Sequence, residues 1–298
     1  MAEMKDRFVR FDWAIKRLLR QKANFGVLEG FLTVFLGEKV TIVDILESES
    51  NQQDEFDKFN RVDIKARNSK GEIIIVEVQN TSEVFYLERI LYGVAKAITE
   101  HISLGDDYGE VKKVYSISVL YFDLGEGDDY LYKGQTSFFG IHTNDELKIT
   151  TRQRDAIVRK APEEIFPTYY LIRVNNFDRV AVSPMEEWMR YLKKGEISAD
   201  AKAPGLQEAR EKLLYYQMDP AERHAYDEHL NAVMIQNDVL GNARAEGLAE
   251  GRAEGLAEGK TSQQMLTART MLSDGMSIDL VAKYTGLTKS QIEAFAAE

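Results

Sequence analysis

The chain has 298 residues, of which 44% are hydrophobic, so it is long enough to bury a sizeable core and to carry a smaller second region. No apolar run approaches roughly eighteen residues, and the N-terminus lacks the apolar stretch and cleavage site of a signal peptide, so we expect no membrane span and no secretion signal. Cysteine is absent, which excludes disulfides and thiolate metal sites and fits a cytoplasmic location.

The net charge of −11 argues against a protein that coats DNA irrespective of sequence, because such a protein needs a broad basic surface. A nuclease is not excluded, since a bound divalent cation offsets local acid and basic residues can be concentrated in one region. Residues 1–24 hold seven Lys and Arg against three acids. The overall sign of the charge therefore does not decide whether the chain binds DNA.

Apolar periodicity and β-forming residues predict an α/β core. Apolar residues at helical spacing predict helices at 8–36, 83–103 and 183–195. Gly37 ends the first of these regions, and Ser183 is the expected N-cap of the last. Runs of β-formers predict strands at 40–46, 59–67, 72–80, 114–122, 136–142, 148–153 and 168–174. The order helix, hairpin, helix, strand indicates an α/β fold.

Composition changes after about residue 196, which divides the chain into four predicted parts. These are a core at 1–196, a helical extension at 197–243, an AEG repeat at 244–260 and a small helical hairpin at 261–298. The repeat, "RAEGLAEGRAEGLAEG", places a glycine at every fourth residue, and four glycines cost a helix about 4 kcal/mol against alanine. The repeat is therefore either a flexible, partly helical tether or a helix whose glycine ridge lets another helix approach, which favours a homo-oligomer, most simply a dimer.

The last segment, residues 271–298, resembles the two-helix part of a helix-turn-helix. Ser277 can cap its first helix, Gly286 provides the turn and Thr288 can cap its second helix. The second helix carries one base, Lys289. The alternative is a helical hairpin that packs on its neighbour and does not read DNA.

The stretch "RVDIKARNSKGEIIIVEVQN", residues 61–80, predicts a β-hairpin that brings two acids together. With Gly71 in the left-handed position of a three-residue loop, Asp63 lies directly opposite Glu77. Opposed residues share one face of the sheet with Cβ atoms about 4.5–5.5 Å apart. Gln79, two residues after Glu77, points to the same side. A slip of one residue would send Asp63 to the other face.

Two carboxylates this close repel, so one of them protonates unless a cation lies between them. Mg²⁺ is the natural cation, with Mn²⁺ possible, because it accepts two carboxylates, a carbonyl such as that of Val78, and waters. Such an ion polarises a phosphate oxygen and activates a water for attack. Gln79 can orient that water or a phosphate but cannot act as a base. The alternative is an acid pair in solvent that Lys or Arg side chains neutralise.

The pattern D-x₁₃-E-V-Q lies between "FDWAIKRLLRQKANFGVLEGFL" and "ERILYGVAKAITEHI". Together these stretches resemble the PD-(D/E)XK nuclease superfamily and, within it, the Rpn-type recombination-promoting nuclease or transposase family. "MEEWMRYLKKGE", the AEG repeat and "GLTKSQIE" extend the resemblance over nearly the whole chain. It implies a restriction-endonuclease-like core, a mixed sheet flanked by helices, with an α-helical C-terminal extension.

The resemblance also implies a function and the roles of several residues. Asp63 and Glu77 would be metal ligands, and Gln79 stands where the superfamily usually has a lysine, which leaves the proton acceptor undefined. The implied activity is that of a Mg²⁺-dependent DNA endonuclease linked to recombination or mobile elements. The alternative is a catalytically inactive nuclease-fold scaffold or interaction protein.

Three further residues are candidates for the site. Lys65 lies on the face of Asp63 and either supplies positive charge or is a surface lysine. Glu29 matches the acid that the superfamily carries on its first helix, or else lies on a solvated face. Arg89, on the helix after Gln79, either contacts phosphate or scaffolds the site.

Overall fold

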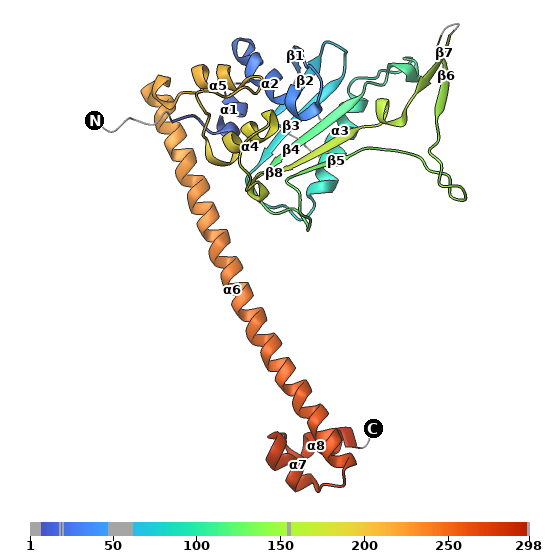
Figure 1. Ribbon diagram of the computed structural model, residues 1–298, viewed down its shortest axis with the longest axis vertical. Helices are drawn as coiled ribbons and strands as arrows, with labels where there is room; N and C mark the ends of the chain where they lie inside the picture. The colour runs from blue at the N-terminus through green and yellow to red at the C-terminus, as the bar shows by residue number, and fades with distance from the viewer. Residues whose placement is uncertain (1–6, 18, 20, 47–61, 154–155, 297–298) are drawn as a thin grey trace. The chain divides into compact units, whose positions relative to one another are not determined.

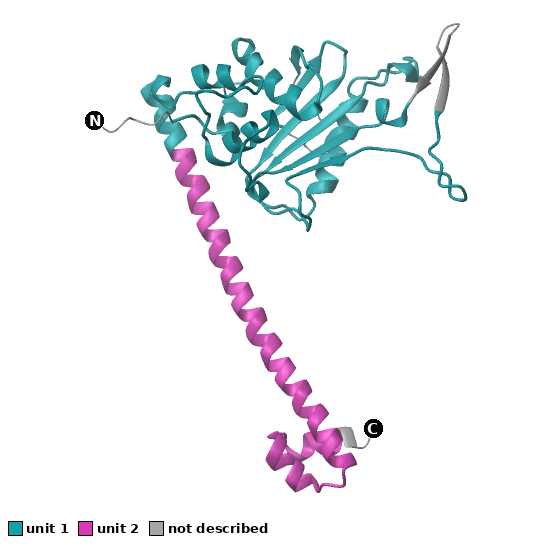
Figure 2. Ribbon diagram, viewed as in Figure 1, with its two compact units in different colours: residues 1–227 teal, residues 228–298 magenta. Residues whose placement is uncertain are grey.

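The computed structural model describes residues 7–17, 19, 21–46, 62–153 and 156–296. It forms two compact units, residues 1–227 and 228–298, which Figure 2 colours separately. Among the helices of the described residues, none combines the length and the apolar character that crossing a membrane requires.

A six-stranded mixed sheet forms the centre of the first unit, with the strand order β1-β2-β3-β4-β8-β5 (Figure 1). The strands are β1 (Ile42–Leu46), β2 (Ile64–Asn68), β3 (Ile73–Gln79), β4 (Val114–Leu120), β5 (Leu131–Gly134) and β8 (Thr168–Arg173). β3, β4 and β8 run parallel, whereas β1, β2 and β5 pair antiparallel with their neighbours. β6 (Ile149–Gln153) and β7 (Ala156–Lys160) form a separate two-stranded sheet.

Helices cover both faces of this sheet. The helices of the unit are α1 (Phe11–Arg17), α2 (Phe25–Leu36), α3 (Tyr86–Thr99), α4 (Pro184–Lys194) and α5 (Leu206–Lys212). Figure 1 shows α3 on one face and the other four gathered on the opposite side. Ile73 and Ile75 of β3 pack with Val94 of α3 in one apolar cluster. β3 is buried from Ile73 to Val78, as expected for a central strand that is covered on both faces.

The helices on the opposite side are joined by aromatic side chains and by one close backbone approach. The Phe31 ring of α2 lies 5.4 Å from Trp188 of α4, centroid to centroid. Gly30 of α2 meets Gly205, where a Cβ on Gly30 would lie 2.4 Å from the Gly205 Cα. Only glycine permits this approach. Ser183 begins α4 with a capping box, as the sequence predicts.

The second unit consists of most of one long helix and a helical hairpin. α6 runs from Pro220 to Ser273, and α7 (Ile278–Thr285) and α8 (Lys289–Ala296) follow it. Ala268, Val281, Leu287 and Ile292 form the buried core of this hairpin and the end of α6. The AEG repeat is helical in the structure, because it lies within α6. A Cβ added to any of the four glycines at 247–259 would meet no atom within 4 Å, so the glycine ridge lies open.

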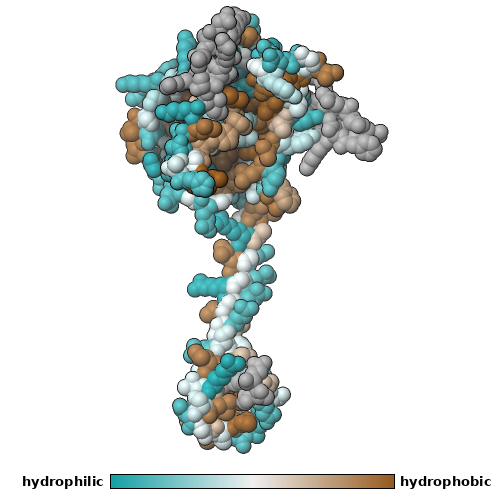
Figure 3. All heavy atoms as spheres, turned by 90° about the vertical axis from the view of Figure 1, so that its right-hand side faces the viewer, coloured by the Kyte–Doolittle hydropathy of each residue, from teal (hydrophilic) through white to brown (hydrophobic). Residues whose placement is uncertain are grey.

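The surface differs between these parts. Figure 3 shows apolar side chains gathered on one face of the first unit, whereas hydrophilic and neutral residues predominate on the visible part of α6.

One predicted strand is wrong and two strands were missed. Residues 136–142 form no strand, and within them Phe139 makes an isolated bridge to Glu146. β5 lies earlier, at Leu131–Gly134, where it pairs with the edge of β8. β7 was also missed. Of the strand predicted at 59–67, residues 59–61 lie outside the described residues.

Candidate active site

The hairpin of β2 and β3 has the register that its loop predicts. Gly71 has a φ of +80°, and its N–H donates to the Asn68 carbonyl at 2.9 Å. The ladder pairs Ile64 with Val76 and continues in the same register to Arg67. One residue further along, this register places Asp63 opposite Glu77.

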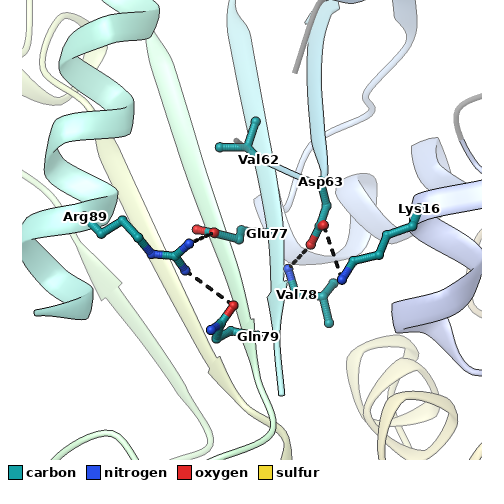
Figure 4. Close-up of a pocket in the computed structure, with 7 residues that line it drawn as sticks. All are labelled: Lys16, Val62, Asp63, Glu77, Val78, Gln79 and Arg89. Carbon is teal, nitrogen blue, oxygen red and sulfur yellow. Dashed lines mark hydrogen bonds and ion pairs between the residues drawn. The ribbon is translucent and has the colours of Figure 1, made fainter. Parts of the chain in front are cut away.

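Both acids lie in a pocket of about 430 Å³ beside the carboxyl end of β3 (Figure 4). The pocket is lined by Lys16, Val62, Asp63, Glu77, Val78, Gln79 and Arg89. These residues come from α1, from the start of the hairpin, from β3 and from the first turn of α3. Ligands of α/β proteins commonly bind at such strand ends.

Asp63 is held by the backbone of β3 and by one base. Its Oδ2 accepts the Val78 N–H at 2.7 Å, and Lys16 Nζ lies 3.6 Å from its Oδ1. Burial raises the pKa of Asp63, while Lys16 and the Val78 N–H oppose the rise. In a strand that pairs antiparallel, the N–H and C=O of one residue point to the same side, so the Val78 carbonyl faces the Asp63 side of β3.

Glu77 is buried, with 8% of its surface exposed, and it pairs with Arg89. The Arg89 NH1 lies 2.7 Å from its Oε1. Burial raises the pKa of Glu77 to about 7, Arg89 lowers it, and the neighbouring Asp63 and Glu83 raise it. Each acid therefore has its own basic partner, which supports in part the interpretation of an acid pair neutralised by Lys and Arg. The pair lies in a pocket and not in open solvent.

Gln79 points into the same pocket but contacts other side chains. Its Oε1 lies 3.4 Å from the Arg89 NH2, and its Nε2 donates to Glu83 Oε1 at 2.8 Å. Gln79 is thus tied to the first turn of α3.

Lys65 and Glu29 lie outside the set of residues that line this pocket. The expectation of a surface lysine is wrong, because Lys65 is buried and its Nζ lies 2.6 Å from Glu100 Oε2. Glu29 is half-buried, and its Oε1 accepts the Ile42 N–H at 2.7 Å at the start of β1. Each of these side chains serves a local contact of the fold.

Lys16 was not predicted as a pocket residue, and the sequence left open whether Arg89 contacts phosphate or scaffolds the site. The signal for Lys16 was the excess of bases in residues 1–24. The signal for Arg89 was its position in the first turn of the helix that follows Gln79, close to the end of β3.

The residues of the pocket fit a hard divalent cation. In the part of the chain that the structure describes, no three His, Cys, Asp or Glu side chains are grouped to hold a metal. Mg²⁺ does not need a third acid, because one or two carboxylates, a carbonyl and several waters satisfy it. Burial and mutual repulsion disfavour the charged forms of Asp63 and Glu77, and a dication relieves both effects. Together with the Val78 carbonyl, they form a suitable donor set.

Comparison with known proteins gives two matches on this chain. Residues 9–150 match the model of the PD-(D/E)XK nuclease family transposase, a range that contains all seven pocket residues. Residues 264–296 match the C-terminal HTH domain of the Rpn/YhgA-like nuclease family, a range that contains α7 and α8. Searches of curated proteins and of solved structures found no match. The two matches lie on separate parts of the chain, and together they support its assignment to the Rpn-type family of PD-(D/E)XK nucleases.

Proposed function

We propose that this protein is a metal-dependent DNA endonuclease that hydrolyses phosphodiester bonds. The observation that carries the proposal is the meeting of Asp63 and Glu77 in one pocket beside the backbone of Val78. The match of residues 9–150 to this nuclease family supports the reaction class. The transposase description of that family supports a link to recombination or mobile elements.

Five of the seven pocket residues have a role in this proposal. Asp63, Glu77 and the Val78 carbonyl would hold Mg²⁺ or Mn²⁺, which when bound would supply a Lewis acid for a phosphate oxygen and lower the pKa of the attacking water. Gln79 orients the water or the phosphate through its carboxamide. Lys16 contributes positive charge on the Asp63 side, which favours a DNA backbone close to the acids.

The second unit has a binding role in the same proposal. The match of residues 264–296 to an HTH domain supports DNA binding through α7 and α8. The open glycine ridge of α6 supports close contact with the same helix of a second copy. A dimer suits cleavage of both DNA strands, because each chain has one proposed site. In this proposal, residues 1–196 carry the nuclease activity and residues 261–298 direct the protein to its DNA target.

The test is cleavage of supercoiled plasmid DNA by the full chain with Mg²⁺, with Mn²⁺ or with EDTA. Asp63→Asn and Glu77→Gln should each lower the rate by about a hundredfold or more, since each removes an anionic donor for the ion. Asp44→Asn is the matched control, because Asp44 is an exposed acid of β1 that pairs with Arg67. Equal cleavage by all variants would identify a contaminating nuclease.

A scaffold without activity is the second candidate, and specific contacts favour it. Asp63 and Glu77 already form ion pairs with Lys16 and Arg89. In addition, Gln79 stands where the superfamily usually has a lysine. This function predicts that the chain neither cleaves DNA with any divalent metal nor binds Mn²⁺ in a calorimetric titration. Binding of Mn²⁺ that Glu77→Gln abolishes would exclude it.

A further inference from the structure

Arg89 lies at the centre of a closed set of polar contacts, of which those to Glu77 and Gln79 are drawn in Figure 4. Its guanidinium contacts Glu77 at 2.7 Å, Glu83 at 2.9 Å and Gln79 at 3.4 Å. Gln79 closes the set through its hydrogen bond to Glu83. The guanidinium also lies 5.1 Å from the centre of the Tyr86 ring. Arg89 is therefore held from several sides while it lines the pocket.

This placement supplies a charge that Gln79 lacks. A carboxamide can orient a phosphate but cannot neutralise it, whereas a guanidinium is always protonated and binds phosphate through paired N–H donors. Because the Arg89 NH2 lies against the Gln79 carboxamide, the positive charge stands directly beside the third residue of the motif.

The charge balance of the pocket changes when a metal ion enters. As the structure stands, Asp63 and Glu77 are balanced by Lys16 and Arg89. A dication added to this neutral set repels both bases, and Glu77 cannot bind it with the oxygen that Arg89 occupies. Arg89 can leave Glu77 without leaving the pocket, because its guanidinium also forms an ion pair with Glu83 at 2.9 Å.

We propose that Arg89 is a further catalytic residue. Without a metal ion its guanidinium pairs with Glu77, and when Glu77 binds the ion the guanidinium moves to a phosphate oxygen of the DNA backbone. This inference rests on the proposed function, because it needs both the ion and a phosphodiester substrate. It adds competition between Arg89 and the metal ion for Glu77, which the pair of acids alone does not imply. Arg89 and the ion bind Glu77 in turn, so the loss of Arg89 strengthens metal binding and weakens cleavage.

The experiment measures Mn²⁺ binding and plasmid cleavage on the same preparations of the full chain. Arg89→Ala should bind Mn²⁺ about tenfold more tightly, since a competing charge is gone. It should cleave about a hundredfold more slowly, a loss typical of one missing donor to a transition state. Arg89→Lys retains the charge but not the paired donors, so its Mn²⁺ affinity should stay near wild type while cleavage falls. Arg67→Ala, which removes an exposed arginine of β2, is the control and should change neither quantity.

Two results would overturn the inference while the proposed function stands. One is Mn²⁺ binding by Arg89→Ala that equals or falls below wild type, and the other is cleavage within about threefold of wild type. If Arg89→Ala does not fold, as thermal unfolding will report, Arg89→Lys decides, and cleavage by it at the wild-type rate refutes the role in phosphate binding. A wild-type chain that neither binds Mn²⁺ nor cleaves DNA refutes the proposed function, and this inference falls with it.

Discussion

The metal-free protein should lose stability as the pH rises from 5 to 8, because Glu77 is a buried acid. Its pKa in the folded chain is about 7, against an ordinary value of 4.5. Between these two values the folded chain keeps a proton that the unfolded chain has released. The contribution of Glu77 to the free energy of unfolding is therefore highest below pH 4.5 and is lost as the pH rises through 7.

The size of this loss follows from the difference between the two pKa values. One pKa unit corresponds to about 1.4 kcal/mol, so Glu77 accounts for a decrease of about 2 to 3 kcal/mol between pH 5 and pH 8. The raised pKa of Asp63 acts in the same direction. Glu77→Gln replaces the titrating group by a neutral side chain of the same shape. The variant should match wild type near pH 5 and be more stable by up to about 3 kcal/mol at pH 8.

Urea unfolding followed by tryptophan fluorescence measures this effect in the first unit alone. The chain has two tryptophans, Trp13 and Trp188, and both are buried in the first unit. The second unit therefore does not contribute to the signal. Titrations of wild type and Glu77→Gln in EDTA at several pH values give the difference in stability directly.

A stability difference that does not change with pH would refute this reasoning. So would a Glu77→Gln variant that is less stable than wild type at pH 8, because Glu77 would then be stabilised by Arg89 as an ordinary ion pair. The metal gives an independent check at pH 8. Free Mg²⁺ at about a hundred times its Kd should raise the stability of wild type by about 3 kcal/mol and leave Glu77→Gln unchanged.

Three further predictions concern the framework around the site. Lys65→Met should lower the free energy of unfolding by about 3 kcal/mol by leaving the half-buried Glu100 without its base, and Mn²⁺ calorimetry should show unchanged affinity; tighter binding would place the positive charge of Lys65 in the site. Gly30→Ala should cost about 2 kcal/mol or more in urea unfolding, because its Cβ would lie 2.4 Å from the Gly205 Cα, and a neutral effect would show that the two segments can separate. Ser183→Ala should cost about 1 kcal/mol through loss of the α4 capping box, while Ser183→Asp should retain most of that stability.

The register of the β2–β3 hairpin was predictable because local chemistry decides it. A glycine in the left-handed region fixes a three-residue loop, and the loop fixes which residues face each other across the ladder. The meeting of Asp63 and Glu77 then follows from counting residues. Caps at Ser183 and Gly37 were predictable for the same reason, since each depends on a few adjacent residues.

The partners of the acids were not predictable, because they come from distant parts of the chain. Lys16 reaches Asp63 from α1, and nothing local to either residue indicates the pairing. Lys65 was assigned to the right face, yet its partner Glu100 lies at the end of α3 and removes it from the site. β5 was missed because it has only four residues, and its pairing with β8 makes it a strand.

These long-range contacts explain how the fold can carry the half-buried Asp63 and the buried Glu77 so close together. α1 and α3 each contribute one base to the hairpin, Lys16 on the Asp63 side and Arg89 on the Glu77 side. A base that neutralises an acid in the free protein is already close to the place where a phosphate will be negative. In the proposed function, the same side chains stabilise the fold and later face the DNA backbone, and Arg89 can give up Glu77 because Glu83 and Gln79 also lie against it.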